Sequence, residues 1–303
     1  VLRLADRAVL TMRRLVLAAL LAAMVPTAPA RAEAAPSAEV ATPRSEIFAL
    51  SSTQTGLRYR IFVARPALPP PEGGYPVLYY LDGNATFRTA AEAVRLQTRP
   101  PKGFGPAVVV GVGYETDEPF ETTLRYFDYT TPVDPARLRP RGNGEPYPAL
   151  GGADAFITFL EDDLFPAVAA RLPVDPERRA LVGHSLGGYF TLHAFLERPD
   201  LFETWVAGSP SIWWDEGSIL GRAAAFAAEP PDLAGRRLFI GVGAEELDHM
   251  VAEAGQMAGA LAPAQEAGLA LGHQEFAGEE HITVLPALIS RSVRLALEAP
   301  GVR

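Results

Sequence analysis

The strongest chemical signal in the sequence is a serine flanked by glycines, in the segment Gly183-His184-Ser185-Leu186-Gly187-Gly188. The spacing matches the G-x-S-x-G pattern, in which the serine lies on a sharp turn between a strand and a helix. Small residues on both sides let the chain turn tightly and expose the hydroxyl above a sheet. An apolar run precedes the segment and a helical pattern follows it. We therefore predict that Ser185 is a nucleophile.

A serine hydroxyl needs a general base to accept its proton, and the sequence offers five histidines. His184 neighbours the nucleophile, and its side chain is expected to point away from it. His193 falls within a helical pattern, His249 at the start of another helix, and His273 within the last predicted strand. His281 lies in the turn after that strand, where the base stands when the order is serine, acid, histidine. We predict that His281 is the base.

The acid that orients the histidine is expected just after the apolar run 238–242, where three carboxylates lie close together. A buried carboxylate at this point holds the imidazole in one tautomer and stabilises its cation. Acids in this arrangement often stand three residues after the glycine that ends the strand. This spacing favours Glu246, then Glu245, then Asp248. The same residues also fit a solvated helix start, where negative charge is favourable by itself.

A carbonyl group attacked by a serine becomes an oxyanion, which needs two backbone donors. The amide of Leu186, directly after the nucleophile, is one predicted donor. The other is expected from the loop after the apolar run 77–81, where Gly83 and Asn84 tolerate the backbone conformations that turn an amide toward a ligand. A plain turn at this position is the alternative interpretation.

The elements that must position these residues follow an alternating pattern of strands and helices. Residues 47–50 and 57–63, with a turn between them, predict a hairpin. Continuous apolar runs separated by helices indicate strands buried on both faces, and hence an α/β fold with a mostly parallel central sheet. These runs are 77–81, 107–112, 179–182, 204–207, 238–242 and 269–276.

One long segment, residues 115–152, interrupts this alternation. It has no clear periodicity but many Pro, Tyr and Arg residues. A connection of this length is uncommon unless it is functional or disordered, and its aromatic content argues against disorder. We interpret it as a substrate-covering loop inserted before a helix at 153–171.

The N-terminal residues have the features of an export signal. A basic Met12-Arg13-Arg14 precedes the apolar run 15–25 and an Ala-x-Ala site that ends at Ala32. Residues 1–32 are thus predicted to be an upstream extension and signal peptide, 33–45 a flexible leader, and 46–303 a single domain. An uncleaved anchor helix is the alternative. We expect a secreted protein, periplasmic where the cell has a periplasm, with no stable membrane insertion after cleavage.

Composition excludes several classes of protein. The formal net charge of −9 argues against a general affinity for nucleic acid, which needs a basic surface. The absence of cysteine excludes disulfides, thiolate catalysis and cysteine-based metal sites. Oligomeric state does not follow from these data.

Six spaced blocks of the sequence resemble the putative-esterase family of α/β hydrolases, and are most similar to its siderophore-esterase branch. Members of that branch hydrolyse the trilactones of enterobactin and salmochelin. The resemblance runs from residue 46 to residue 297. The blocks are Leu81-Asp82-Gly83-Asn84, Gly111-Val112-Gly113-Tyr114, Arg125-Tyr126-Phe127-Asp128-Tyr129-Thr130, the serine segment, Ser209-Pro210-Ser211-Ile212-Trp213-Trp214 and Gly278-Glu279-Glu280-His281.

The resemblance implies an α/β-hydrolase fold and an enzyme that acts on a small-molecule ester without a metal or organic cofactor. It implies that Arg125 lies near the substrate, where a cation suits an anionic catecholate. Arg137, Arg139 and Arg141 lie in the same loop and fit either the same role or a solvated face. Trp213 and Trp214 fit two positions equally, stacked on an aromatic acyl group or packed beneath the site.

Three functions remain open at this level. They are a siderophore esterase, a broad carboxylesterase for aryl or acyl esters, and a non-catalytic binding protein of the same fold. The branch also includes members with a Ser-His dyad, so the sequence leaves open whether an acid is required.

Overall fold

The computed structural model describes residues 40–101, 103–142 and 144–298. The described residues from Thr42 onward cluster as one compact unit. Within the described residues, eight strands form one sheet in the order β1-β2-β4-β3-β5-β6-β7-β8. The strands are β1 (Ser45–Ser51), β2 (Arg58–Ala64), β3 (Tyr75–Tyr80), β4 (Val108–Gly113), β5 (Val174–His184), β6 (Thr204–Gly208), β7 (Arg237–Gly243) and β8 (Ala270–Phe276).

The sheet is antiparallel only at its N-terminal edge. β1 pairs with β2 as the predicted hairpin, and β2 pairs antiparallel with β4, whereas all pairs from β4 to β8 are parallel. Where both faces of a parallel strand are buried, its sequence is apolar, as in Val-Val-Val-Gly-Val-Gly of β4. The mostly parallel α/β fold with an N-terminal hairpin is therefore confirmed.

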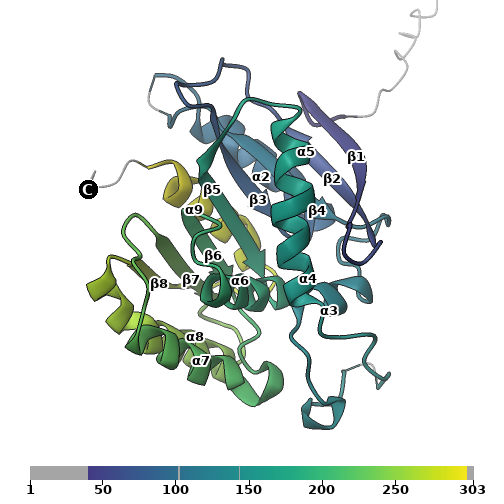
Figure 1. Cartoon of the computed structure of the whole chain (residues 1–303), viewed down its shortest axis with the longest axis vertical. Helices are drawn as coiled ribbons and strands as arrows, with labels where there is room; N and C mark the ends of the chain where they lie inside the picture. Colours follow the sequence, from purple (N-terminus) through teal and green to yellow (C-terminus); the bar gives the residue numbers. More distant parts are fainter. Residues whose placement is uncertain (1–39, 102, 143, 299–303) are drawn as a thin grey trace, which may run out of the picture. The chain divides into compact units, whose positions relative to one another are not determined.

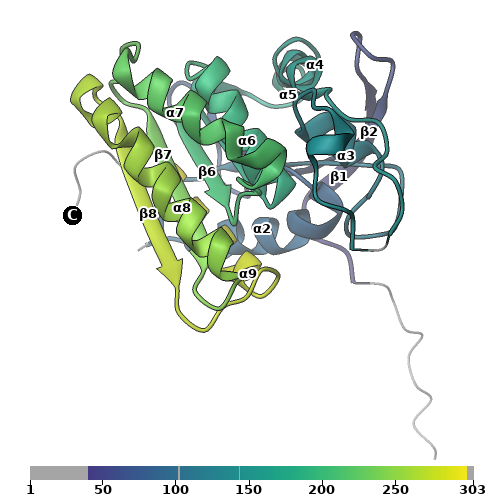
Figure 2. The ribbon, with the colours of Figure 1, turned by 90° about the horizontal axis from the view of Figure 1, so that it is seen from below.

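Helices cover both faces of this sheet (Figure 2). On one face lie α2 (Gly83–Gln97) and α9 (Val284–Leu297), which pack against each other. On the other lie α6 (Leu186–Glu197), α7 (Ser218–Ala228) and α8 (Asp248–Leu261). In α2 the buried residues recur every three or four positions, as an amphipathic helix on a sheet requires. In α6 residues 186–195 are all buried, because neighbouring helices cover its outer side.

The predicted helix at 153–171 is continuous in space but not uniform. It consists of α4 (Ala153–Thr158), a π-helical stretch over Phe159–Leu164, and α5 (Phe165–Ala169). The preceding insertion, residues 115–152, contains the short helix α3 (Leu124–Tyr129), which the sequence did not predict. Figure 1 shows α3 beside α4, below the carboxyl end of the sheet.

The parallel strands end toward a common edge, and the turns there carry the predicted site residues. The loop after β3 starts α2, β5 runs into the serine, β7 precedes the acids, and the β8–α9 turn holds His281. The predicted signal peptide and most of the leader lie outside the described residues. Across the part of the chain that is described, no helix has the length and apolarity to cross a membrane.

Candidate active site

Ser185 lies at the strained turn between β5 and α6. Its backbone has φ 60° and ψ −119°, a conformation that non-glycine residues rarely adopt and that is typical of functional sites. The turn is possible because Gly183 has no side chain. A Cβ at that position would lie 2.1 Å from the carbonyl oxygen of Gly187. The sequence pattern therefore corresponds to a real steric requirement, and the hydroxyl is presented beyond the end of the sheet.

His281 and Glu246 form the contact expected of a base and its orienting acid. The two side chains are 2.7 Å apart, between Nδ1 of His281 and Oε2 of Glu246. The other oxygen of Glu246 accepts hydrogen bonds from Ser209 Oγ at 2.5 Å and from the Gly243 amide at 2.8 Å. A carboxylate can only accept, so Nδ1 carries the proton and Nε2 is left free to act as a base.

The environment of Glu246 keeps its carboxylate ionised. Burial raises its pKa, but the hydrogen bonds from His281, Ser209 and Gly243 outweigh burial and hold the pKa below its ordinary value. The competing acids Glu245 and Asp248 are exposed at the surface. Of the three carboxylates, Glu246 is the one in contact with His281.

Ser185 and His281 line one cavity of about 460 Å3. Within the described residues, the hydroxyl of Ser185 has one neighbour at hydrogen-bonding distance, Ser211 Oγ at 3.5 Å. The amide of Ser211 also donates to the carbonyl oxygen of Ser185. Catalytic hydrogen bonds are often long before substrate binds, and both side chains face the same cavity, where a substrate would meet them.

His184 supports His281 from the buried side. The two imidazole rings lie with centroids 4.6 Å apart and planes inclined by 43°. Burial lowers the pKa of His184 to about 3, and repulsion from His281 adds to this effect. His184 is therefore neutral at pH 7 and contributes packing rather than charge next to the base.

The predicted oxyanion donors lie in the first turns of two helices, α2 and α6. Amides in a first helical turn have no partner within their own helix, and the amides of Gly83, Asn84 and Leu186 donate no hydrogen bond within the described chain. The two helix starts adjoin, since a Cβ on Gly187 would stand 3.5 Å from Leu81 and Asp82. The starts of α2 and α6 are thus neighbours, and free amides at helix N-termini suit an anion.

The side chain of Asn84 forms structural hydrogen bonds, whereas its backbone amide is the predicted oxyanion donor. Its Oδ1 accepts from the Tyr114 amide at 2.8 Å, and its Nδ2 donates to the carbonyl oxygens of Tyr114 and Thr116. These bonds attach the start of α2 to the end of β4. Gly83 allows the close approach, because a Cβ there would meet the backbone of Gly111 at 2.8 Å.

The insertion supplies much of the cavity wall. Its residues Tyr126, Arg139, Arg141 and Tyr147 line the same space as Ser185. The guanidinium of Arg141 faces the rings of Tyr126 and Tyr147 at 5.2 and 6.0 Å. Arg139 is exposed and has a hydrogen-bonding contact of 3.3 Å with His249. Arg137 pairs instead with Asp215 and Glu216 and does not line this cavity.

The two adjacent tryptophans have different positions. Trp213 lines the cavity. Trp214 is fully buried and packs against Tyr126 and Tyr147, with ring centroids 6.1 and 5.6 Å away. Of the two positions that the sequence left open, Trp214 therefore takes the packed one, behind the wall that Tyr126 and Tyr147 form.

Arg125 lies outside the cavity wall. Its side chain is buried, does not line the cavity, and forms a bidentate ion pair with Asp82, at 3.0 Å for each of two bonds. Burial works against its charge, but the carboxylate of Asp82 raises the pKa of Arg125 above its ordinary value. The arginine is thus directed at the loop before α2 rather than at the cavity that holds Ser185.

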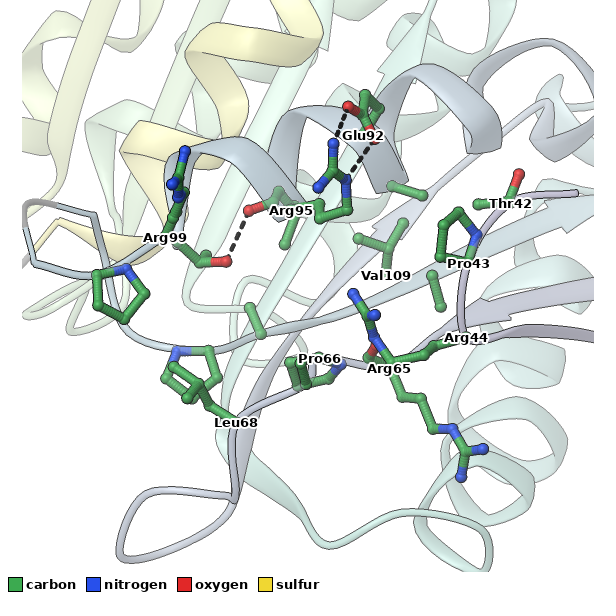
Figure 3. A pocket seen from close by; sticks show the side chains of 18 residues that line it. Thr42, Pro43, Arg44, Arg65, Pro66, Leu68, Glu92, Arg95, Arg99 and Val109 are labelled. Atoms are coloured by element: carbon green, nitrogen blue, oxygen red, sulfur yellow. Dashed lines mark hydrogen bonds and ion pairs between the residues drawn. The ribbon is translucent and has the colours of Figure 1, made fainter. Parts of the chain in front are cut away.

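A second cavity lies at the other end of the sheet and contains none of the predicted site residues. It has a volume of about 310 Å3 and an apolar floor at the end of β2 and the start of β4. Figure 3 shows Arg95 paired with Glu92 on one side and Arg65 on another. Its distance from the carboxyl ends of the strands separates it from the chemistry of Ser185.

Several residues of the site were not singled out by sequence reasoning. Ser209 and Ser211 belong to one of the six blocks that resemble the family, but they carry no spacing signal of their own. Asp82 stands in the loop Leu81-Asp82-Gly83-Asn84, where its adjacency to the predicted donors was the available clue. Tyr126 and Tyr147 were visible only as part of an aromatic-rich insertion.

The fold and the serine, histidine and glutamate together define an α/β hydrolase. Residues 52–278 match the model of a family described as "Putative esterase". The chain is 41% identical over 265 residues to the ferri-bacillibactin esterase BesA of Bacillus subtilis. The match covers 86% of this chain and 91% of that protein. The chain therefore belongs to the putative-esterase family, and it is a hydrolase that acts on ester bonds.

Solved structures agree with this assignment. A BES protein from Bacillus cereus has a TM-score of 0.79 and 32% sequence identity, and the match covers 88% of this chain and 100% of that one. The siderophore hydrolase EstB from Aspergillus nidulans has a TM-score of 0.72 and 30% identity, covering 88% and 99%.

Proposed function

We propose that the chain is a siderophore esterase that cleaves the ester bonds of a catecholate trilactone. The observation that carries the proposal is the composition of the cavity around Ser185. It combines two arginines, Arg139 and Arg141, with aromatic side chains including Tyr126 and Trp213. Aromatic faces and cations suit an acyl group that is both aromatic and anionic. Two similar proteins, a ferri-bacillibactin esterase and a siderophore hydrolase, support the same substrate class.

The proposed reaction begins with the transfer of a proton from Ser185 Oγ to Nε2 of His281. The oxygen of Ser185 attacks the ester carbonyl, and the amides of Leu186 and Asn84 hold the resulting oxyanion. Glu246 keeps the imidazole in the required tautomer and stabilises its cation. The tetrahedral intermediate then expels the alcohol, which takes the proton from His281, and leaves an acyl group on Ser185.

Hydrolysis of this acyl-enzyme follows the reverse route. A water molecule gives a proton to His281 and attacks the acyl carbonyl, and the same two amides stabilise the second oxyanion. Collapse of that intermediate releases the acid and returns the proton to Ser185. The insertion is proposed to cover the substrate during these steps, because Tyr126, Arg141 and Tyr147 form one side of the cavity.

A comparison of substrates tests the proposal. The purified chain is assayed with a ferric catecholate trilactone and with a short-chain p-nitrophenyl ester, with Ser185→Ala as the control. We expect kcat/KM to be at least about 100-fold higher for the trilactone, since a pocket with built-in polar partners discriminates against substrates that lack them. Equal or lower kcat/KM for the trilactone would identify a broad aryl or acyl carboxylesterase instead.

We further propose that residues 1–32 direct export and that the mature protein is secreted, to the periplasm where one exists. The basic residues before the apolar run 15–25 and the Ala-x-Ala site ending at Ala32 support this. N-terminal sequencing of the exported protein is expected to begin at Glu33. A chain that keeps residues 12–32 and remains with the membrane would indicate an anchor.

A further inference from the structure

The loop that precedes the oxyanion donors contains a strained residue, Asp82. It has φ 50° and ψ 50°, in the left-handed region, and immediately precedes Gly83 and Asn84. Non-glycine residues adopt this region in only a small share of cases, and surrounding contacts hold them there. The direction of the Gly83 and Asn84 amides follows from the conformation of Asp82, so its contacts determine the geometry of the donors.

Two residues of α3 supply the contacts that hold Asp82. Arg125 donates from Nε and Nη2 to the two carboxylate oxygens, each at 3.0 Å. Tyr129 accepts a hydrogen bond from the Asp82 amide at 3.2 Å. Asp82 and Arg125 are 2% and 9% exposed, so solvent does not compete with this ion pair. A bidentate, buried pair has one geometry, and it fixes the loop in that geometry.

The carboxylate of Asp82 also lies close to the place where negative charge develops. Its Oδ2 is 3.5 Å from the position that a Cβ on Gly187 would take, in the first turn of α6. An unpaired carboxylate there would repel an oxyanion bound at the Leu186 amide, because a buried charge is poorly screened. The guanidinium of Arg125 compensates the negative charge of Asp82 and so reduces its repulsion of the oxyanion.

We propose that Arg125 is a positioning residue of the oxyanion loop, acting through Asp82 by fixing its left-handed backbone and by cancelling its charge. This rests on the proposed function, since it concerns the same oxyanion site. The proposal gives α3, a helix of the insertion, two roles. Its residue Arg125 holds the oxyanion loop, and the next residue, Tyr126, lines the cavity of Ser185. Arg125 is not a group that binds the substrate.

Three variants and two substrates test this role: Arg125→Met, Arg125→Lys and the double variant Asp82→Asn/Arg125→Met, each with neutral p-nitrophenyl butyrate and with the catecholate trilactone. For Arg125→Met we expect kcat to fall about 10- to 100-fold on both substrates, somewhat less than the loss of a whole oxyanion donor. KM is expected to change less than about threefold, as for a group that acts in the transition state.

The double variant separates positioning from substrate binding. Asp82→Asn removes the buried unpaired carboxylate that Arg125→Met leaves behind, so we expect kcat to recover at least about fivefold over the single variant. Arg125→Lys keeps the charge but loses the bidentate geometry, and its kcat is expected between those of the wild type and Arg125→Met. Arg137→Met, which breaks an exposed ion pair of the same insertion, is the matched control, with unchanged kinetics.

A different result would overturn the proposal. If Arg125→Met raises KM for the anionic trilactone but leaves kcat for the neutral ester unchanged, Arg125 binds substrate. A double variant no faster than the single variant would also contradict it. Should Arg125→Met fail to fold by circular dichroism, Arg125→Lys and the double variant decide. A wild type that cleaves only the neutral ester removes the siderophore assignment and leaves this test intact.

Discussion

Glu246 reaches His281 because it stands three residues beyond Gly243, where the chain turns back over the end of β7. The side chain of Glu246 is fully buried. Its carboxylate accepts hydrogen bonds from Ser209, Gly243 and His281. At this scale the sequence predicted a great deal: the glycine spacing gave the serine, the turn after the last strand gave the histidine, and the distance from Gly243 favoured Glu246. It could not separate the three acids fully, because burial depends on the backbone around Ser209.

The first prediction concerns this acid. Glu246→Gln removes the negative charge beside His281 and can hold the wrong tautomer, so kcat is expected to fall about 100- to 10,000-fold, as for the equivalent change in serine proteases. Steady-state kinetics with the simple ester give the measurement. Glu245→Gln, at the exposed neighbouring position, is the control and is expected to stay within about twofold of wild type, as surface substitutions usually do. An equal loss in both variants would contradict the assignment.

The second prediction concerns the glycines of the serine segment. Gly183→Ala would place a Cβ 2.1 Å from the Gly187 carbonyl oxygen, whereas a Cβ on Gly187 meets its nearest atoms at an ordinary 3.5 Å. We expect Gly183→Ala to lower the melting temperature by several degrees. The new Cβ would meet backbone atoms, so the backbone itself must move to relieve the clash. Gly187→Ala is expected to unfold near the wild-type temperature. Thermal unfolding by circular dichroism measures both, and the reverse order would contradict the steric account.

At the scale of elements, α3 connects the insertion to the rest of the molecule. Asp128 on this helix is buried and accepts hydrogen bonds from Tyr59 of β2 at 3.1 Å and from Tyr114 after β4 at 3.0 Å. The sequence did not predict α3, because six residues without hydrophobic periodicity give no helical signal. Most strands, by contrast, were predicted to within two residues of their ends, because burial on both faces makes them continuously apolar. The exception is β5, whose polar, partly exposed first half, from Val174 to Arg178, gave no strand signal.

Asp128 gives the third prediction. Burial raises its pKa to about 7, although the hydrogen bonds from Tyr114 and Tyr59 oppose this. The folded-state pKa is above the unfolded value, so the folded chain binds this proton more tightly. The contribution of Asp128 to the free energy of unfolding therefore falls as pH rises from about 4 to about 7. Asn has no titrating carboxyl group, so Asp128→Asn removes this pH-dependent decrease in the free energy of unfolding.

Denaturant unfolding at pH 5 and pH 8 measures this effect. We expect the decrease in unfolding free energy between these pH values to be smaller in Asp128→Asn than in wild type, by about 2 kcal/mol. Asp117→Asn, at a fully exposed carboxylate of the same insertion, is the control and keeps the wild-type difference. A decrease in Asp128→Asn as large as that of wild type would show that Asp128 stays ionised through this range.

At the scale of the whole molecule, the cavity is assembled from segments far apart in the sequence: the insertion, the serine turn, the stretch after β6, the start of α8 and the β8–α9 turn. Such an assembly explains where sequence reasoning failed. Trp213 and Trp214 are neighbours with the same side chain, and tertiary packing alone decides which faces the cavity. Arg125 was assigned to the substrate by its position in a shared block, but its partner Asp82 is 43 residues away in sequence.

The fourth prediction uses the charge of this cavity. Arg139 is exposed and has no carboxylate partner among the described residues, so its cation is available to an anionic substrate. In Arg139→Gln, KM for the catecholate trilactone is expected to rise about tenfold, which corresponds to one partly desolvated ionic contact. KM for the neutral ester is expected to be unchanged. Initial-rate kinetics on both substrates decide, and an equal rise for the neutral ester would assign Arg139 a structural role.

The central claim, that Ser185 is the nucleophile of an esterase, is tested most directly by covalent labelling. The protein is treated with a fluorophosphonate, digested, and the modified residue is located by mass spectrometry. We predict one label per chain, on Ser185, with loss of ester hydrolysis in proportion to labelling and no label on Ser185→Ala. A label on Ser211, or full hydrolytic activity after Ser185 is modified, would contradict the account.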